Sequence, residues 1–202
     1  MQADYESGTA AQKKIDEAGS QGQDVILVEL VNNHGATTGV LEKIAAHKDP
    51  GHLHRAFSVF LFDEADRLLL QRRALTKYHS PGVWSNSCCG HPYPYEFPFL
   101  AAARRTAAEL GAPPAELREA GITQYHHRDA ITGLVEQEYN HLFVGLVRQP
   151  LTPDPDEVSE ITFSTPGELR RLRNSDPFSS WFETVFRAAQ PTIRAVTGAG
   201  NW

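Results

Sequence analysis

Apolar runs along the first third of the chain predict β-strands separated by short polar turns. The runs at 24–32, 56–62 and 67–73 are rich in Val, Leu, Ile and Phe, as buried strands are. The segment 33–39 contains two glycines and is expected to form the turn after the first strand. The acidic residues at 63–66 separate the second and third runs, which predicts a hairpin there.

Helical periodicity and stop signals predict three helices in the rest of the chain. The Ala-rich segment 97–110 ends before Gly111 and Pro113, as expected of a helix with a C-terminal glycine. The sequence TPGE at 165–168 is a capping box with proline in the first turn. One apolar helical face, with spacing i, i+3, i+4, i+7 and i+8, is formed by Phe178, Trp181, Phe182, Val185 and Phe186.

Three further segments, 121–127, 133–147 and 160–165, have strand character. Strands and helices do not follow the regular βαβ alternation of a doubly wound sheet, so the expected fold is α/β (α+β) with helices packed on a mixed sheet. We expect one domain at 24–202, preceded by a polar N-terminal tail at 1–23 with room for a short helix.

The composition restricts the class of partner. The chain has 202 residues, 41% of them hydrophobic, and a net charge of −6, which together indicate a folded core and disfavour nucleic acid as a ligand. No apolar run approaches the about 18 residues of a membrane span, and no secretory signal is recognisable. Cys88 and Cys89 are adjacent and too close for an ordinary disulfide, which favours free thiols in a reducing cytoplasm.

The most specific motif extends from Gly90 to Gly111. Glu96, Arg104 and Glu109 stand between the two glycines at intervals that resemble the Nudix box, G-x5-E-x7-R-E-u-x-E-E-x-G-u, where u is a bulky apolar residue. The alternative is an ordinary Ala-rich helix with scattered charges.

This box departs from the pattern in the residues that hydrolases need. Arg105 and Ala108 stand where glutamates are expected, and Thr106 and Ala112 replace apolar residues. A hydrolase that activates water with several Mg²⁺ ions would lose most of its ligands. The pattern therefore favours retained diphosphate binding with loss of hydrolysis.

Histidines and glutamates elsewhere suggest a metal site. Glu136 and Glu138 are two residues apart on a predicted strand, so both carboxylates can share a face and reach one ion. Together with His47, His54 and His91 they would form a mixed nitrogen and oxygen site suited to Mn²⁺, Mg²⁺ or Zn²⁺. Taken singly, each histidine is more typical of a surface or core residue, and the spacing is not that of a zinc finger.

Several stretches together resemble the type 1 isopentenyl diphosphate isomerase family, over residues from about 24 to about 181. They are TTGVLEKIAAH, LHRAFSVFLFD, LLLQRRALTKYHSPGVWSNSCCGHP, RRTAAELG, GLVEQEYNHLFVG and FSSW. The resemblance implies a Nudix-like fold and isomerisation of isopentenyl diphosphate to dimethylallyl diphosphate in isoprenoid biosynthesis. The reaction would proceed by protonation and deprotonation through a tertiary carbocation-like state.

The resemblance also implies roles for individual residues. The metal ligands would be the three histidines with Glu136 and Glu138, and Glu109 would help to hold a Mg²⁺ that arrives with the diphosphate. Substrate cations would be Lys43, Arg73, Lys77 and Arg105, and the catalytic set would be Cys89, Glu138, Tyr125 and Trp181. The expected partner is a small prenyl diphosphate, bound by a cytoplasmic monomer or homodimer.

Some choices stay open at this point. Counting back from Glu136 without a gap places His126 where the family has its proton-relay tyrosine, whereas a one-residue shift places Tyr125 there. Strand alternation should point Cys88 away from Cys89. The alternative functions are a Nudix-type pyrophosphohydrolase, a non-catalytic binding module, and an isomerase for a modified or longer prenyl diphosphate.

Overall fold

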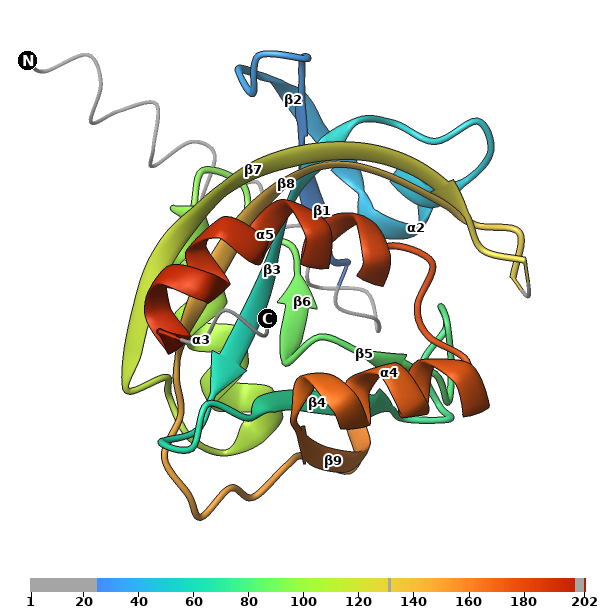
Figure 1. The fold of residues 1–202 in the computed structure, drawn as a ribbon. Helices are drawn as coiled ribbons and strands as arrows, with labels where there is room; N and C mark the ends of the chain where they lie inside the picture. The colour runs from blue at the N-terminus through green and yellow to red at the C-terminus, as the bar shows by residue number, and fades with distance from the viewer. Residues whose placement is uncertain (1–24, 131, 199–201) are drawn as a thin grey trace, which may run out of the picture.

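The computed structural model describes residues 25–130, 132–198 and 202, which form a mixed β-sheet with helices packed on it (Figure 1). The strands are β1 (Leu27–Val31), β2 (Thr37–Glu42), β3 (His54–Phe62), β4 (Leu68–Arg73), β5 (Trp84–Ser85), β6 (Cys88–Gly90), β7 (Glu116–Arg128), β8 (Val135–Leu146) and β9 (Val158–Ser164). The helices are α2 (Lys43–His47), α3 (Pro98–Leu110), α4 (Pro166–Ser175) and α5 (Phe182–Thr197).

The sheet is organised around the parallel pair β3 and β8. Strands β1, β4 and β6 pair with β3 in the antiparallel sense, β7 pairs with β8, and β9 pairs with β4. In the β3–β8 register, His54 stands opposite Glu138 and Phe62 opposite Leu146. The predicted mixed sheet is thus confirmed.

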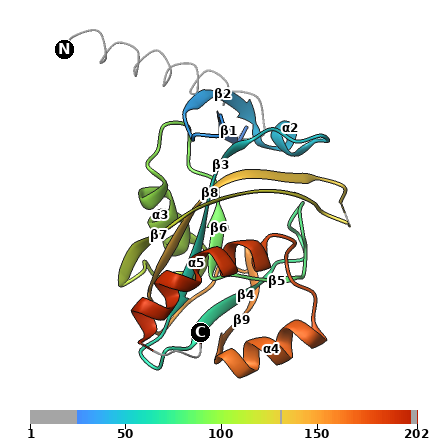
Figure 2. The ribbon, with the colours of Figure 1, turned by 45° about the horizontal axis from the view of Figure 1, so that its top comes forward.

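Side-chain alternation along β3 gives the sheet two apolar faces. Phe57, Val59 and Leu61 belong to the core with α3, whereas Phe60 and Phe62 belong to the core with α5. The two helices therefore cover opposite faces (Figure 2). Each fully buried phenylalanine contributes up to about 3 kcal/mol, and a one-residue slip would exchange the faces, so the burial also determines the strand register.

Three local predictions that rest on turn and cap chemistry are confirmed. Strands β3 and β4 form the expected antiparallel hairpin, with Phe62 opposite Leu68. Helix α3 ends at Gly111, whose φ of 72° is left-handed. A Cβ on Gly111 would lie 2.1 Å from Thr152 Oγ1, so only glycine fits. Helix α4 begins with the predicted capping box between Thr165 and Glu168.

Several predicted element boundaries were wrong. Residues 37–39 were expected in a turn, but they belong to β2 because they pair with β1. The last helix begins at Phe182, and Phe178 instead forms a β-bridge to Trp84 and packs its ring 4.7 Å from that of Phe182. The predicted strand at 121–127 begins earlier, as part of β7. The expected tail at 1–23 lies outside the described residues.

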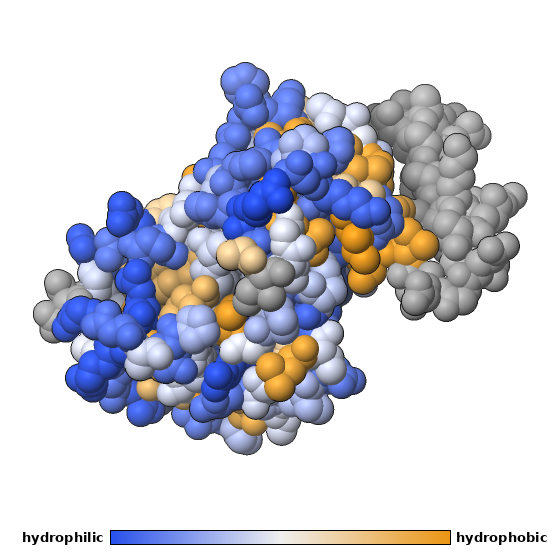
Figure 3. All heavy atoms as spheres, turned by 90° about the vertical axis from the view of Figure 1, so that its right-hand side faces the viewer, coloured by the Kyte–Doolittle hydropathy of each residue, from blue (hydrophilic) through white to orange (hydrophobic). Residues whose placement is uncertain are grey.

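Among the described residues, no helix has the length and apolar character needed to cross a membrane. The face of the molecule in Figure 3 is mainly hydrophilic, and its apolar residues lie in separate patches.

Candidate active site

A cavity of about 290 Å³ brings most of the predicted site residues together. Its walls include the four predicted substrate cations and the predicted catalytic residues. They also include Glu109, the predicted ligand of the substrate's Mg²⁺, and three of the five predicted metal ligands. These lining residues are Lys43, Arg73, Lys77, Cys89, His91, Arg105, Glu109, Tyr125, Glu136, Glu138 and Trp181. His47 and His54 do not line the cavity and are fully buried.

The site is a polar continuation of the sheet face that α5 covers. Along β8, Leu142 and Val144 pack in the core with α5, and residues of the same parity nearer the start of the strand are Glu138 and Glu136. The β3–β8 register sets His54 opposite Glu138 on this face. The same face of β3 and β8 is therefore apolar where α5 covers it, and it carries ligating side chains nearer the start of both strands.

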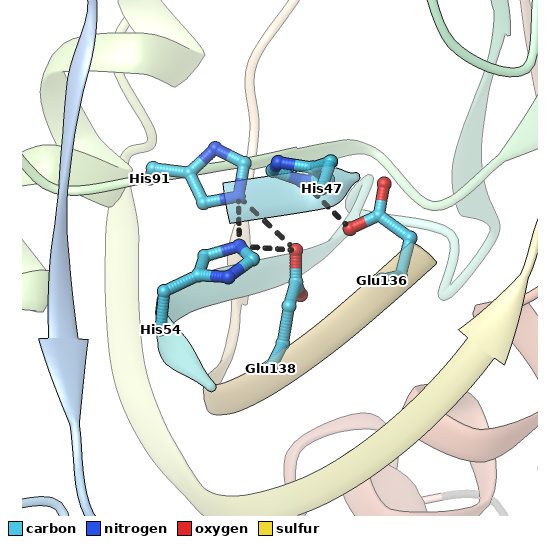
Figure 4. Close-up of side chains that lie close together, drawn as sticks. All are labelled: His47, His54, His91, Glu136 and Glu138. Atoms are coloured by element: carbon cyan, nitrogen blue, oxygen red, sulfur yellow. Dashed lines mark hydrogen bonds and ion pairs between the residues drawn. The ribbon is translucent and has the colours of Figure 1, made fainter. Parts of the chain in front are cut away.

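The five predicted metal ligands converge. One ligating atom from each of His47, His54, His91, Glu136 and Glu138 lies within 4.8 Å of all the others, and the side chains point toward one another (Figure 4). His54 Nε2 lies 3.0 Å from His91 Nε2, and Glu138 Oε1 lies 3.1 Å from His91 Nε2. This buried His/Glu cluster could hold a metal ion.

The outer ring nitrogens make the cluster suitable for a cation. Nδ1 of His47 lies 2.6 Å from the Lys43 carbonyl oxygen, and Nδ1 of His54 lies 2.7 Å from the His52 carbonyl oxygen. A carbonyl only accepts, so each Nδ1 carries the proton and each Nε2 presents a lone pair to the cluster. His47 Nε2 makes no hydrogen bond although it is buried. The donor set therefore fits a divalent cation.

Burial keeps the imidazoles of His54 and His91 neutral, as metal ligands must be. It lowers the pKa of His54 to about 4, with a further contribution from His47. Burial also holds the pKa of His91 well below its usual value, and His54 adds to this effect.

The two carboxylates have opposite proton affinities. Burial and the nearby charge of Glu136 raise the pKa of Glu138 well above its usual value. Burial also raises the pKa of Glu136, but the adjoining imidazoles of His47 and His79 outweigh burial and hold the Glu136 pKa well below its usual value. Of these two carboxyl groups, Glu138 is therefore the one that binds a proton more readily when only the protein's own charges act on it.

The adjacent cysteines lie on opposite faces of the sheet, as strand alternation predicted. In the register of β6 with β3, Cys88 stands opposite Val59 and is fully buried in the core with α3. Cys89 stands opposite Ser58, lines the cavity, and lies 4.0 Å from Arg73 Nη1. Burial raises the pKa of Cys89 to about 12 although Arg73 lowers it, so the thiol is protonated at neutral pH.

Tyr125, and not His126, faces the site. Tyr125 stands opposite Glu138 across the β7–β8 pair, and its hydroxyl donates a hydrogen bond to Glu138 Oε2. Asn140 Nδ2 donates to the same oxygen at 2.8 Å. His126 is exposed on the other side of the strand, with Nε2 2.9 Å from the Pro50 carbonyl oxygen.

Two of the predicted substrate cations pair with a carboxylate that sequence reasoning missed. Glu157 pairs with Lys77 and, at 3.1 Å, with Arg105. Arg105 Nη2 also donates to Glu109 Oε1 at 2.5 Å. Burial and the charge of Lys77 lower the pKa of Lys43. Such a group of cations would bind a polyanion. Glu157 was missed by the sequence analysis because it belongs to no recognised motif.

Trp181 forms another part of the cavity wall, just before α5. Its ring stacks on His79 at 5.6 Å between centroids and an interplanar angle of 16°, and the Arg73 guanidinium lies 5.5 Å from its centroid. Its Nε1 lies 3.4 Å from Asn86 Oδ1. His79, like Glu157, was missed, and its only sequence signal was its place in the stretch KYHSPGVW.

The fold and the site together define a NUDIX-domain protein. The NUDIX domain profile matches residues 52–184. The solved structure of DR0079 from Deinococcus radiodurans is similar, with a TM-score of 0.66 and 18% identity over 80% of this chain and 98% of that one. A MutT protein from Methanosarcina mazei has a TM-score of 0.55 and 17% identity over 69% of this chain and 94% of that one. At this identity the likeness concerns the fold alone.

Curated relatives identify the family within this class. The isopentenyl-diphosphate Delta-isomerase of Streptomyces avermitilis is 63% identical over 180 residues, which cover 89% of this chain and 91% of the relative. The enzyme of the same name from Nocardia farcinica is 43% identical over 85% of this chain and 98% of its own length. The chain belongs to the isopentenyl-diphosphate Delta-isomerase family, as the sequence resemblance predicted.

Proposed function

We propose that this chain interconverts isopentenyl diphosphate and dimethylallyl diphosphate in isoprenoid biosynthesis. The observation that carries the proposal is that the Cys89 thiol and the Glu138–Tyr125 pair line one cavity together with the four predicted substrate cations. Family membership indicates the substrate, and the cavity contains the acid, base and cationic groups that isomerisation of this substrate requires.

The diphosphate binds among Lys43, Arg73, Lys77 and Arg105. Charge-assisted contacts of guanidinium and ammonium groups with phosphate oxygens are strong, and Arg105 offers two-pronged contacts. The substrate's Mg²⁺ binds next to Glu109, whose Oε1 already faces Arg105. The replacement of a Nudix glutamate by Arg105 thus changes a metal ligand into a phosphate ligand.

The His47, His54, His91, Glu136 and Glu138 cluster holds a second divalent cation, for which Mn²⁺, Mg²⁺ and Zn²⁺ are the candidates. Mixed imidazole and carboxylate donors accept all three, so the donor set does not select among them. When bound, the cation supplies positive charge that lowers the proton affinity of the neighbouring carboxylates. Removal of divalent cations with a chelator should therefore abolish turnover, and re-addition should restore it.

The reaction moves one proton onto the terminal alkene carbon and removes another from the neighbouring methylene. Between these events the substrate carries tertiary cation character, and the double bond re-forms one position along, so that composition is unchanged. One group must donate and another must accept, and we assign these roles to Cys89 and Glu138, with Tyr125 as the hydrogen-bond partner of Glu138. The two roles exchange with the direction of the reaction.

Trp181 protects and stabilises the cationic state. An indole face stabilises a nearby cation by about 0.5–2 kcal/mol. Its burial, with only 4% of the residue exposed, also keeps water from this wall of the cavity. Water exclusion matters because water would trap the carbocation as an alcohol.

Proton NMR of isopentenyl diphosphate in D₂O, with purified protein and Mg²⁺, tests the proposal. We expect dimethylallyl diphosphate with deuterium in its methyl groups. Release of inorganic phosphate or pyrophosphate without isomerisation would support the hydrolase alternative, and turnover only of a longer prenyl diphosphate would change the substrate. No reaction with any of these substrates would contradict the proposal and would favour the non-catalytic binding module.

A further inference from the structure

His79 contacts the metal-ligand candidate Glu136 on the side away from the His/Glu cluster. Its side chain is 2% exposed, and its ring lies between two carboxylates. Nδ1 is 2.8 Å from Glu136 Oε1, and Nε2 is 3.3 Å from Asp129 Oδ2. Nδ1 donates to Glu136, because a carboxylate oxygen is an acceptor and the other ring nitrogen, Nε2, makes no hydrogen bond.

This contact divides the two oxygens of Glu136 between two tasks. Oε2 faces the cluster, 3.2 Å from His47 Nε2, while Oε1 faces His79. A ligating carboxylate whose second oxygen is hydrogen-bonded has a fixed orientation, and such outer partners typically change metal affinity by about 10–100-fold. His79 is thus placed to fix Glu136 with one oxygen toward the cation.

The position of the His79 ring is itself well determined. Arg73 Nη2 donates to the His79 carbonyl oxygen at 2.9 Å, and Arg73 Nε donates to that of Ser80 at 3.1 Å. The Ser80 hydroxyl donates to Asp129, the same carboxylate that faces Nε2 of His79. The flat stack on Trp181 fixes the plane of the ring. Backbone, side-chain and stacking contacts together therefore hold the His79 ring in one orientation.

We propose that His79 is a positioning residue, which holds Glu136 in the orientation required for cation binding at the His/Glu cluster. The inference rests on the metal site of the proposed function and adds a residue outside the ligand set. It predicts that the hydrogen bond from Nδ1, and not the bulk of the ring, sets the affinity of the site.

Three variants separate the donor from the ring. His79→Phe keeps a planar ring against Trp181 and removes the donor. His79→Asn removes the ring, but its amide nitrogen can occupy the place of Nδ1 and donate to Glu136. His79→Gln projects its amide to the place of Nε2, toward Asp129, and serves as the donor-lacking variant if His79→Phe does not fold.

The measurement is Mn²⁺ affinity of the full chain, followed by electron paramagnetic resonance of free Mn²⁺, with melting temperatures as the check on folding. We expect affinity at the His/Glu cluster to fall about 10–100-fold in His79→Phe and His79→Gln, and to be largely retained in His79→Asn. Unchanged affinity in the donor-lacking variants would overturn the proposal, as would equal losses in all folded variants. Failure of the unaltered protein to bind Mn²⁺ would instead contradict the metal site itself.

Discussion

Tyr125 and Glu138 face each other across the β7–β8 pair, and the Tyr125 hydroxyl donates a hydrogen bond to Oε2 of Glu138. The other oxygen, Oε1, lies 3.1 Å from His91 Nε2. The phenol therefore holds the oxygen that does not face the imidazoles. Burial and Glu138 both raise the pKa of Tyr125 well above its usual value, so the phenol stays a donor at neutral pH.

Replacing Tyr125 with phenylalanine should lower kcat by about 10–100-fold, because a hydrogen bond to the charged carboxylate that forms when Glu138 gives up its proton contributes about 1.5–3 kcal/mol. The KM for isopentenyl diphosphate should change little, since the phenol is on the proton-transfer side of the site. Steady-state kinetics would measure both. His126→Ala is the matched control on the next residue, and a larger loss in that variant would reverse the choice between the two positions.

The two cysteines should respond differently to alanine. Cys89→Ala should abolish measurable turnover while leaving the melting temperature close to that of the unaltered protein, because the thiol lines the cavity. Cys88→Ala should keep most activity and lose about 1 kcal/mol of stability, because it deletes a fully buried thiol from the core. Kinetics and urea unfolding of both variants measure these effects. Equal loss of turnover would contradict the assignment of Cys89.

Arg105→Gln should raise the KM for isopentenyl diphosphate by about 10–100-fold, the loss of one charge-assisted phosphate contact of about 1.5–3 kcal/mol. The change leaves Glu109 without its arginine partner and Glu157 with Lys77 alone, so the diphosphate would also meet less compensated negative charge. Arg118→Gln removes an exposed arginine that pairs with Glu116 on β7, and it should not affect KM. An unchanged KM in Arg105→Gln would remove this residue from the binding site.

Protein stripped of divalent cations should become less stable as the pH falls from about 6.5 toward about 4. His54 titrates at its ordinary value when unfolded, and burial lowers its pKa to about 4 in the folded state. The unfolded state therefore binds more protons within this window. The free energy of unfolding should fall by up to about 1.4 kcal/mol per pH unit for this histidine, and the contribution should be constant above about pH 6.5.

Urea unfolding at several pH values would measure this slope. His54→Asn should have a shallower slope than the unaltered protein, whatever its stability at neutral pH. His34→Asn, which changes an exposed histidine, should keep the original slope. Equal slopes in all three proteins would show that His54 does not contribute to the pH dependence.

Sequence determined those features of this protein that depend on neighbours along the chain. The glycine end of α3 at Gly111, the capping box of α4 and the β3–β4 hairpin follow from propensities within a few residues. Side-chain alternation likewise placed Glu136 and Glu138 on one face and separated Cys88 from Cys89, because the period of a strand is two wherever the strand lies in the fold.

Only the tertiary structure decided which distant residues meet. The β7–β8 register selects Tyr125 over His126, and the parallel β3–β8 pairing brings His54 to Glu138. His79 and Glu157 gained their places only through contacts with Glu136 and Arg105. Strand register and loop position are set by the burial of both sheet faces together, a property of the whole core that no single stretch of sequence contains.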